Sequence, residues 1–118
     1  MSLKELLNTV LTRHEFAWVE VVNNEGLSIA EAGAEELQEL AARLPPFLES
    51  GDRIARAAQL GHDMGFILLV PKKGVQALLM RTFEVRDQSF TLVAGTEKLP
   101  SKPKQTLESI CQDISGYL

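Results

Sequence analysis

The sequence predicts an α+β fold, in which helices pack on a five-stranded antiparallel sheet. Three observations predict it. Apolar residues recur every three or four positions in three separate segments, as they do along the buried face of an amphipathic helix. Five runs rich in β-branched or aromatic residues lie between these segments. Turn residues separate the runs, which gives the order α-β-β-α-β-β-β-α.

The first helix and the first two strands have clear start and turn signals. Ser2 and Glu5 form a capping box, in which each side chain accepts a hydrogen bond from a backbone amide at the helix start. Residues 16–22 and 27–32 then form a β-hairpin, because the Asn-Asn-Glu-Gly segment between them tolerates positive φ. The apolar face of the helix consists of Leu3, Leu6, Leu7, Val10 and Leu11.

A long helix is predicted from Ala34 to about Leu60, and Gly61 ends it. Pro45 and Pro46 interrupt its pattern, and a proline inside a helix removes a hydrogen bond and clashes with the preceding turn. The apolar seam nevertheless keeps its phase across the prolines, which favours one kinked helix over two separate helices. The seam consists of Leu37, Leu40, Leu44, Phe47, Gly51, Ile54 and Ala58, and Ala41, Leu48 and Ala55 widen it.

Three further strands and a last helix complete the pattern. Residues 65–70 (GFILLV) are continuously apolar, which is typical of a strand buried on both faces. Residues 75–82 and 89–94 form the other two strands, joined by a polar tip around residues 86–88. The apolar face of the terminal helix consists of Leu107, Ile110, Cys111, Ile114 and Tyr117.

Composition bounds the class of protein. The 118 residues suit one domain over residues 1–118, and a net charge of −4 gives no reason to expect a nucleic-acid partner. One cysteine indicates a reducing compartment. No segment reaches the roughly 20 apolar residues that a membrane span needs, and the N-terminus has no signal-peptide pattern. We therefore expect a cytoplasmic protein without membrane insertion.

No constellation of catalytic, metal-binding or cofactor-binding residues can be assembled. The sequence has no phosphate loop or dinucleotide fingerprint. Cys111 lies on an apolar helical stripe, and His14 and His62 lack partners at ligand spacing. Glu20 interrupts an apolar strand, and we expect it to be exposed or to pair with Arg81 or Arg86. Trp18, on the same face of that strand, is predicted to lie in the core.

The complete pattern resembles the Roadblock family. Residues 19–30 are similar to the family's apolar strand, acidic-glycine turn and second strand of the form Gly-Leu-x-Ile. The long helix and the later strands and helix are similar in order and length, so the likeness covers nearly the whole chain. It implies a single Roadblock (profilin-like) domain with sheet order 2-1-5-4-3. The long helix would lie on one face and the terminal helices on the other.

The resemblance also implies a homodimer, in which the third strands pair edge to edge and the long helices pack together. An apolar edge at residues 66–70 supports this, because an unprotected edge of this kind promotes aggregation unless it is paired. The predicted dimer interface consists of Leu40, Ala41, Leu44, Phe47, Gly51, Phe66, Ile67, Leu68, Leu69 and Val70. The predicted partner-binding residues are Glu39, Arg43, Pro45, Pro46 and Glu49.

Roadblock proteins include dynein-associated light chains, scaffolds of Rag-type GTPases and a bacterial activator of the gliding-motility GTPase. The resemblance therefore implies a non-enzymatic adaptor or regulator, active in signalling, that binds a small Ras-like GTPase. Two alternatives remain open. One is an interaction module of the same fold with a non-GTPase partner. The other is a small-molecule sensor, which requires a pocket between the sheet and a helix.

Overall fold

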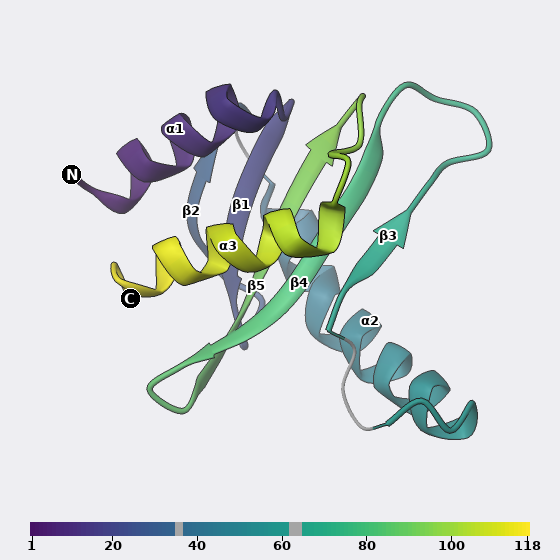
Figure 1. The fold of residues 1–118 in the computed structure, drawn as a ribbon. Helices are drawn as coiled ribbons and strands as arrows, with labels where there is room; N and C mark the ends of the chain where they lie inside the picture. Colours follow the sequence, from purple (N-terminus) through teal and green to yellow (C-terminus); the bar gives the residue numbers. More distant parts are fainter. Residues whose placement is uncertain (35–36, 62–64) are drawn as a thin grey trace.

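The strands form one antiparallel sheet in the order β2-β1-β5-β4-β3, which confirms the predicted order (Figure 1). The computed structural model describes residues 1–34, 37–61 and 65–118. The sequence of elements, α-β-β-α-β-β-β-α, also agrees with the prediction. The elements are α1 (Leu3–His14), β1 (Trp18–Asn23), β2 (Ser28–Ala32), α2 (Gln38–Ala57), β3 (Ile67–Leu69), β4 (Ala77–Val85), β5 (Gln88–Thr96) and α3 (Pro103–Ser115).

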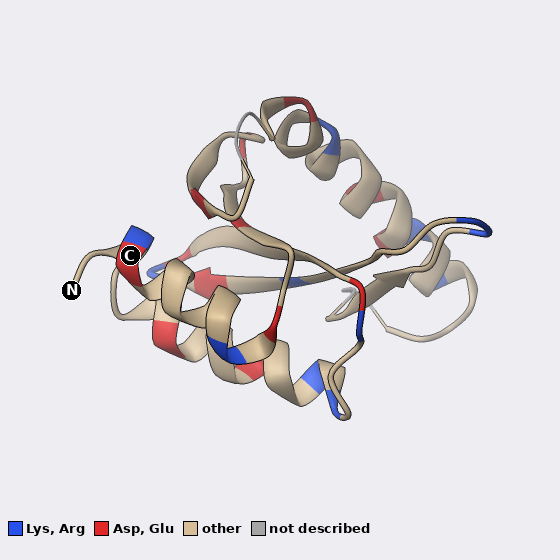
Figure 2. Ribbon diagram, turned by 90° about the horizontal axis from the view of Figure 1, so that it is seen from above, with Lys and Arg blue, Asp and Glu red and all other residues tan. Residues whose placement is uncertain are grey.

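Helices cover both faces of the sheet. Seen along the sheet plane, α2 lies on one side and the pair α1 and α3 on the other (Figure 2). The larger apolar core lies beneath α1 and α3 and includes Leu7, Val19, Leu92 and Ile114. A smaller cluster lies beneath α2 and consists of Val22, Ala41, Leu44, Met80 and Val93. The α2 side of the sheet is therefore the less completely covered face.

The N-terminal helix and the first hairpin form where the sequence predicts them. The Glu5 amide donates to Ser2 Oγ at 3.2 Å, while the Glu5 carboxylate accepts from the Ser2 hydroxyl rather than from an amide. Only half of the predicted capping box is therefore present. In the hairpin turn, Asn23 Oδ1 accepts from the amides of Glu25 and Leu27, each at 2.9 Å. The Asn23 side chain thus supplies the acceptor for two amides of the turn.

The β4–β5 hairpin is longer than predicted. β4 continues to Val85, three residues beyond the expected end at Thr82, and β5 begins at Gln88. Arg86 and Asp87 alone form the turn, with φ of 52° and 65°. Two consecutive residues at positive φ are typical of the tight turn that matches the twist of a hairpin.

Helix α2 runs through both prolines without a break, so the one-helix interpretation is correct. Pro45 removes the amide that would bond to the Ala41 carbonyl, yet the apolar face on both sides of it still packs on the sheet. The helix ends at Ala57, earlier than predicted. Gln59, at φ 60°, adopts the left-handed conformation that commonly ends a helix. The Leu60 amide then donates to the Ala55 carbonyl at 2.8 Å, which closes the last turn.

Two other predictions were wrong in part. The third strand has three residues and forms an edge of the sheet, so within one protomer it is not buried on both faces. Its continuous apolar run instead leaves Leu69 and Val70 exposed. The last helix ends at Ser115, and Tyr117 lies beyond it and is exposed. The Tyr117 amide donates to the Ile114 carbonyl in the closing turn, which carries its ring away from the buried stripe.

Candidate functional site

The apolar face of α2 is wider than its contact with the sheet. Ala41, Leu44 and Ala55 are buried, whereas Phe47 and Ile54 are 39% and 67% exposed. The helix crosses the sheet obliquely, and its C-terminal half extends away from the strands (Figure 1). One part of the apolar face therefore packs on the protomer's own sheet, and the other part has no cover among the described residues.

The uncovered part of α2 lies on the side of the sheet that ends in β3. Strand β3 pairs with β4 on one side only, and Leu68, Leu69 and Val70 are 38%, 44% and 66% exposed. Neither a charged residue nor a proline occurs within residues 66–70. Such an edge is a template for another strand. We call Phe47, Ile54, Leu60, Leu68, Leu69 and Val70 the edge surface.

The predicted dimer-interface residues differ in how far the protomer buries them. Ala41 and Leu44 are buried against the protomer's own sheet, and Leu40, Gly51, Phe66 and Ile67 are half-buried. Phe47 and residues 68–70 are exposed. The predicted interface stopped at Gly51 on the helix, so it included neither Ile54, a residue of the seam, nor Leu60, which lies outside the seam and is 77% exposed. The continuation of the seam beyond Gly51 was the signal that could have found Ile54, whereas no pattern pointed to Leu60.

The predicted partner-binding residues lie on α2. Glu39, Arg43, Pro46 and Glu49 are exposed, and Pro45 is half-buried. Arg43 pairs with Glu39, one turn earlier, with 3.6 Å between Nη2 and Oε1. Exposed pairs of this kind contribute little to stability, about 0.2–1 kcal/mol. Their side chains are therefore free to exchange partners at an interface.

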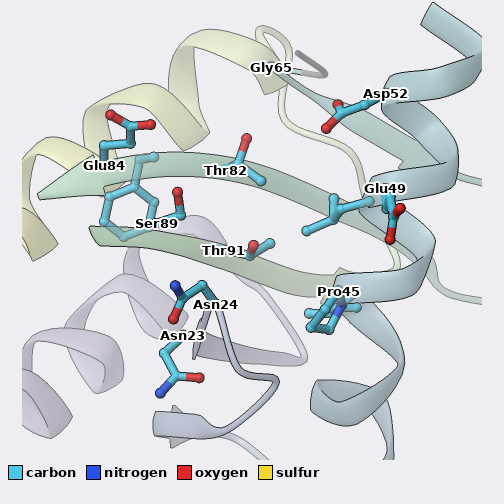
Figure 3. Close-up of a pocket in the computed structure, with 13 residues that line it drawn as sticks. Asn23, Asn24, Pro45, Glu49, Asp52, Gly65, Thr82, Glu84, Ser89 and Thr91 are labelled. Atoms are coloured by element: carbon cyan, nitrogen blue, oxygen red, sulfur yellow. The ribbon is translucent and has the colours of Figure 1, made fainter. Parts of the chain in front are cut away.

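A groove of about 580 Å³ lies between α2 and the sheet (Figure 3). Its walls carry three carboxylates, from Glu49, Asp52 and Glu84, and among the described residues no lysine or arginine belongs to the lining. The groove is therefore an electronegative, partly apolar surface beside the C-terminal half of α2. Its lining consists of Asn23, Asn24, Leu44, Pro45, Leu48, Glu49, Asp52, Gly65, Thr82, Phe83, Glu84, Ser89 and Thr91.

Glu20 is fully buried on the α2 side of β1, and the predicted ion pair does not form. Neither carboxylate oxygen has a hydrogen-bond partner among the described residues. Arg81 lies on the opposite face of the sheet, since it alternates with Met80 of the α2-side cluster, and Arg86 lies at the tip of the β4–β5 hairpin. Desolvation raises the pKa of Glu20 to about 7. The Ser28 hydroxyl lies near enough to lower this pKa in part, although it makes no hydrogen bond to the carboxylate, and the Glu31 charge raises it further.

Trp18 lies one alternation from Glu20 on the same face of β1. It is half-buried and packs against the cluster beneath α2, as predicted for a core residue. Its strand partner is Gly95, and the indole occupies the space that a Cβ at this position would need. The glycine therefore makes room for the aromatic ring at the center of the sheet.

The other candidate reactive groups, Cys111 and His14, pack against apolar or aromatic side chains. Cys111 is buried in the core beneath α3, and burial raises the pKa of its thiol to about 12, so it is not the thiolate that a nucleophile requires. His14 stacks on Phe16, and burial lowers its pKa. Across residues 1–34, 37–61 and 65–118, no three histidine, cysteine or acidic side chains group as metal ligands. His62 and Asp63 lie outside the described residues.

Within the described part of the chain, no helix has the length and apolar character to cross a membrane.

No protein-family model and no curated protein sequence matches the chain. Solved structures share its fold. A Roadblock/LC7 domain from Streptomyces avermitilis has a TM-score of 0.76 at 16% identity, over 99% of this chain and 98% of that one. The gliding protein MglB from Thermus thermophilus has a TM-score of 0.76 at 13% identity, over 98% and 87%. Acanthamoeba castellanii profilin II has 0.59 at 14% identity, over 98% of both chains.

Proposed function

From the fold that this chain shares with Roadblock/LC7 domains and gliding protein MglB, we propose a non-enzymatic homodimeric adaptor or regulator that binds a small Ras-like GTPase. The observation that carries the proposal is the edge surface, which combines an unpaired strand with the uncovered half of α2. The fold alone supports less, because profilin shares it.

The homodimer accounts for the edge surface. Pairing β3 with its two-fold copy would satisfy the free backbone groups of the edge and continue the sheet into the second protomer. The same rotation would bring the α2 helices together on one face of the continuous sheet. Phe47 and Ile54 would then be covered, and burying a side chain of this size contributes about 1.5–3 kcal/mol.

The GTPase-binding surface would be the outer face of the paired α2 helices. Glu39, Arg43 and Pro46 are exposed there, whereas Glu49, also predicted to bind the partner, borders the groove. Charged side chains of both signs beside an apolar strip match the composition of a transient interface with a polar rim. The role proposed for this surface is recognition of a partner.

A nucleotide-dependent binding experiment tests this function. We expect a Ras-like GTPase from the same organism to bind at least about tenfold more tightly when loaded with a non-hydrolysable GTP analogue than with GDP, a typical size for coupling between two sites. Isothermal titration calorimetry measures both affinities. Arg43→Glu should weaken binding, whereas Lys104→Glu, on α3, should not. If the GTPase binds in neither nucleotide state, the partner belongs to another class.

A small-molecule sensor is the second candidate, and the groove between α2 and the sheet is the observation that favours it. A sensor of this kind needs a pocket at this position. Native mass spectrometry of the purified protein would detect a bound metabolite as added mass. Retention of the same compound at dilute protein concentration would favour the sensor over the GTPase regulator.

A further inference from the structure

We propose that the acidic groove is completed by the second copy of this chain, whose β3–β4 turn inserts Lys72 and Lys73 against the groove carboxylates. This inference rests on the homodimer proposed above and adds a specific site to it. Three features carry it: the position of the groove relative to β3, the position of the lysines relative to β3, and the charge of each.

The groove opens beside the start of β3. Gly65, two residues before the strand, belongs to its lining, together with Glu49 and Asp52 of α2. In the close-up, Gly65 lies near Asp52, and Glu49 projects from the same helix (Figure 3). Glu49 pairs with Arg53 one turn later, and both side chains are exposed. Arg53 partly compensates the charge of Glu49, and the described lining also holds the carboxylates of Asp52 and Glu84 but no lysine or arginine.

The two lysines lie beyond the other end of β3. Residues 71–76 connect β3 to β4 and are all exposed. The turn projects from the body of the protein, and its tip is blue, the colour of Lys and Arg (Figure 2). A whole strand separates the turn from Gly65 of the same protomer (Figure 1). The lysines therefore face away from the groove of their own chain.

A two-fold axis between antiparallel β3 strands places the turn of one protomer at the Gly65 end of the partner's β3. If Leu68, the middle residue of β3, pairs with its own copy, Val70 lies opposite the partner's Phe66, and Pro71 lies opposite the partner's Gly65. Lys72 and Lys73 directly follow Pro71, in the bend that begins the turn, so their Cα atoms lie within about 8 Å of it. They therefore arrive at the mouth of the partner's groove, where Asp52 and Glu49 lie.

The charges of the two surfaces are complementary. The groove presents carboxylates from Glu49, Asp52 and Glu84, and the turn presents two adjacent ammonium groups. The two-fold axis generates the contact twice, so each dimer would hold four lysines against two acidic grooves. Such pairs set the register of association and the choice of partner. A chain with a net charge of −4 otherwise repels its own copy, and this contact opposes that repulsion.

A charge-swap experiment tests the contact. One variant carries Lys72→Glu and Lys73→Glu, and the other carries Glu49→Lys and Asp52→Lys. In either variant alone, like charges would meet at both sites of the dimer. We expect each variant to dissociate at least about tenfold more readily than the wild type in low salt, with a smaller difference in high salt, because screening weakens exposed pairs. Sedimentation velocity measures the dissociation constants.

Mixing the two variants gives the decisive comparison. In the mixed dimer, each glutamate turn faces a lysine groove and each lysine turn faces an acidic groove, so we expect dimers to form at close to wild-type affinity. The control variant, Lys102→Glu with Lys104→Glu, makes the same charge change in another exposed segment and should not be rescued by mixing. If the Asp52 substitution impairs folding, as judged by circular dichroism, Glu49→Lys alone replaces that partner.

The outcomes separate this inference from the homodimer itself. Weakening of both variants with rescue on mixing supports the contact. If the wild type is a dimer and the swap variants change its dissociation constant no more than the control variant does, the proposed contact is wrong and the homodimer remains. Weaker dimerisation of both variants that mixing does not restore also contradicts the proposed contact, since the lysines would then act on other groups. A monomeric wild type overturns both.

Discussion

Replacing Leu68 by glutamate is expected to convert the dimer into monomers, weakening self-association by at least about 100-fold, because like charges that meet at an interface cost several kcal/mol. Leu68 is the middle residue of β3 and is 38% exposed in the protomer. On the two-fold axis of the proposed dimer, it lies beside its own copy. The substitution would place two carboxylates together at the center of the paired edge, where neither has a basic neighbour in the strand.

Sedimentation velocity measures the change, and a matched variant separates it from misfolding. Leu27→Glu makes the same substitution at an exposed position in the β1–β2 turn, 58% accessible and remote from β3. This control should remain dimeric, and both variants should keep the circular dichroism spectrum of the wild type. A folded Leu68→Glu protein that dimerises with wild-type affinity would show that β3 is not the dimer edge.

The second large expected effect concerns Glu20. Its folded-state pKa is raised from 4.5 to about 7, so the folded protein holds a proton that the unfolded chain releases between these values. The contribution to stability is therefore fully present below pH 4.5 and is lost as the pH rises through about 7. Glu20→Gln removes the charge, and at pH 8 it should raise the free energy of unfolding by up to about 3 kcal/mol.

Urea denaturation at pH 5 and pH 8 measures this effect. At pH 5 the carboxyl group of Glu20 is mostly protonated, so the variant and the wild type should differ by less than about 1 kcal/mol. Glu31→Gln is the control, because Glu31 pairs with Glu20 across the hairpin but is only half-buried. It should have a small effect at both pH values. Equal stability of Glu20→Gln and wild type at pH 8 would show that the Glu20 charge is satisfied in the folded protein.

The sequence was sufficient to predict the order of elements and the sheet. The Asn23–Gly26 turn, the apolar runs and the helical seams are local signals, and the structure follows them. The continuity of α2 through Pro45 and Pro46 also followed from a local signal, the unbroken phase of its seam. The order 2-1-5-4-3 came from the likeness to Roadblock domains rather than from periodicity.

Other features depend on tertiary geometry that a linear pattern does not contain. Periodicity identified the apolar face of α2 but could not show that the helix crosses the sheet obliquely and leaves Ile54 exposed. The apolar run at residues 65–70 predicted a strand but not its place at an edge. Glu20 was expected to be exposed or to pair with Arg81 or Arg86, but it is fully buried, and alternation along β4 puts Arg81 on the other face of the sheet. The groove combines residues distant in sequence, so no motif predicted it.

The pairing of β3 with its copy underlies both the proposed interface and the completed groove, and amide hydrogen exchange over residues 66–70 measures it directly. In the described part of the protomer, β3 pairs with β4 alone, so we expect amides on its other side to exchange freely in the monomer. We expect residues 66–70 to be strongly protected at a protein concentration of about 100 µM and to lose that protection on dilution toward the dissociation constant. Protection that is equally weak at both concentrations, in a sample that sedimentation shows to be dimeric, would place the dimer contact elsewhere and contradict the pairing.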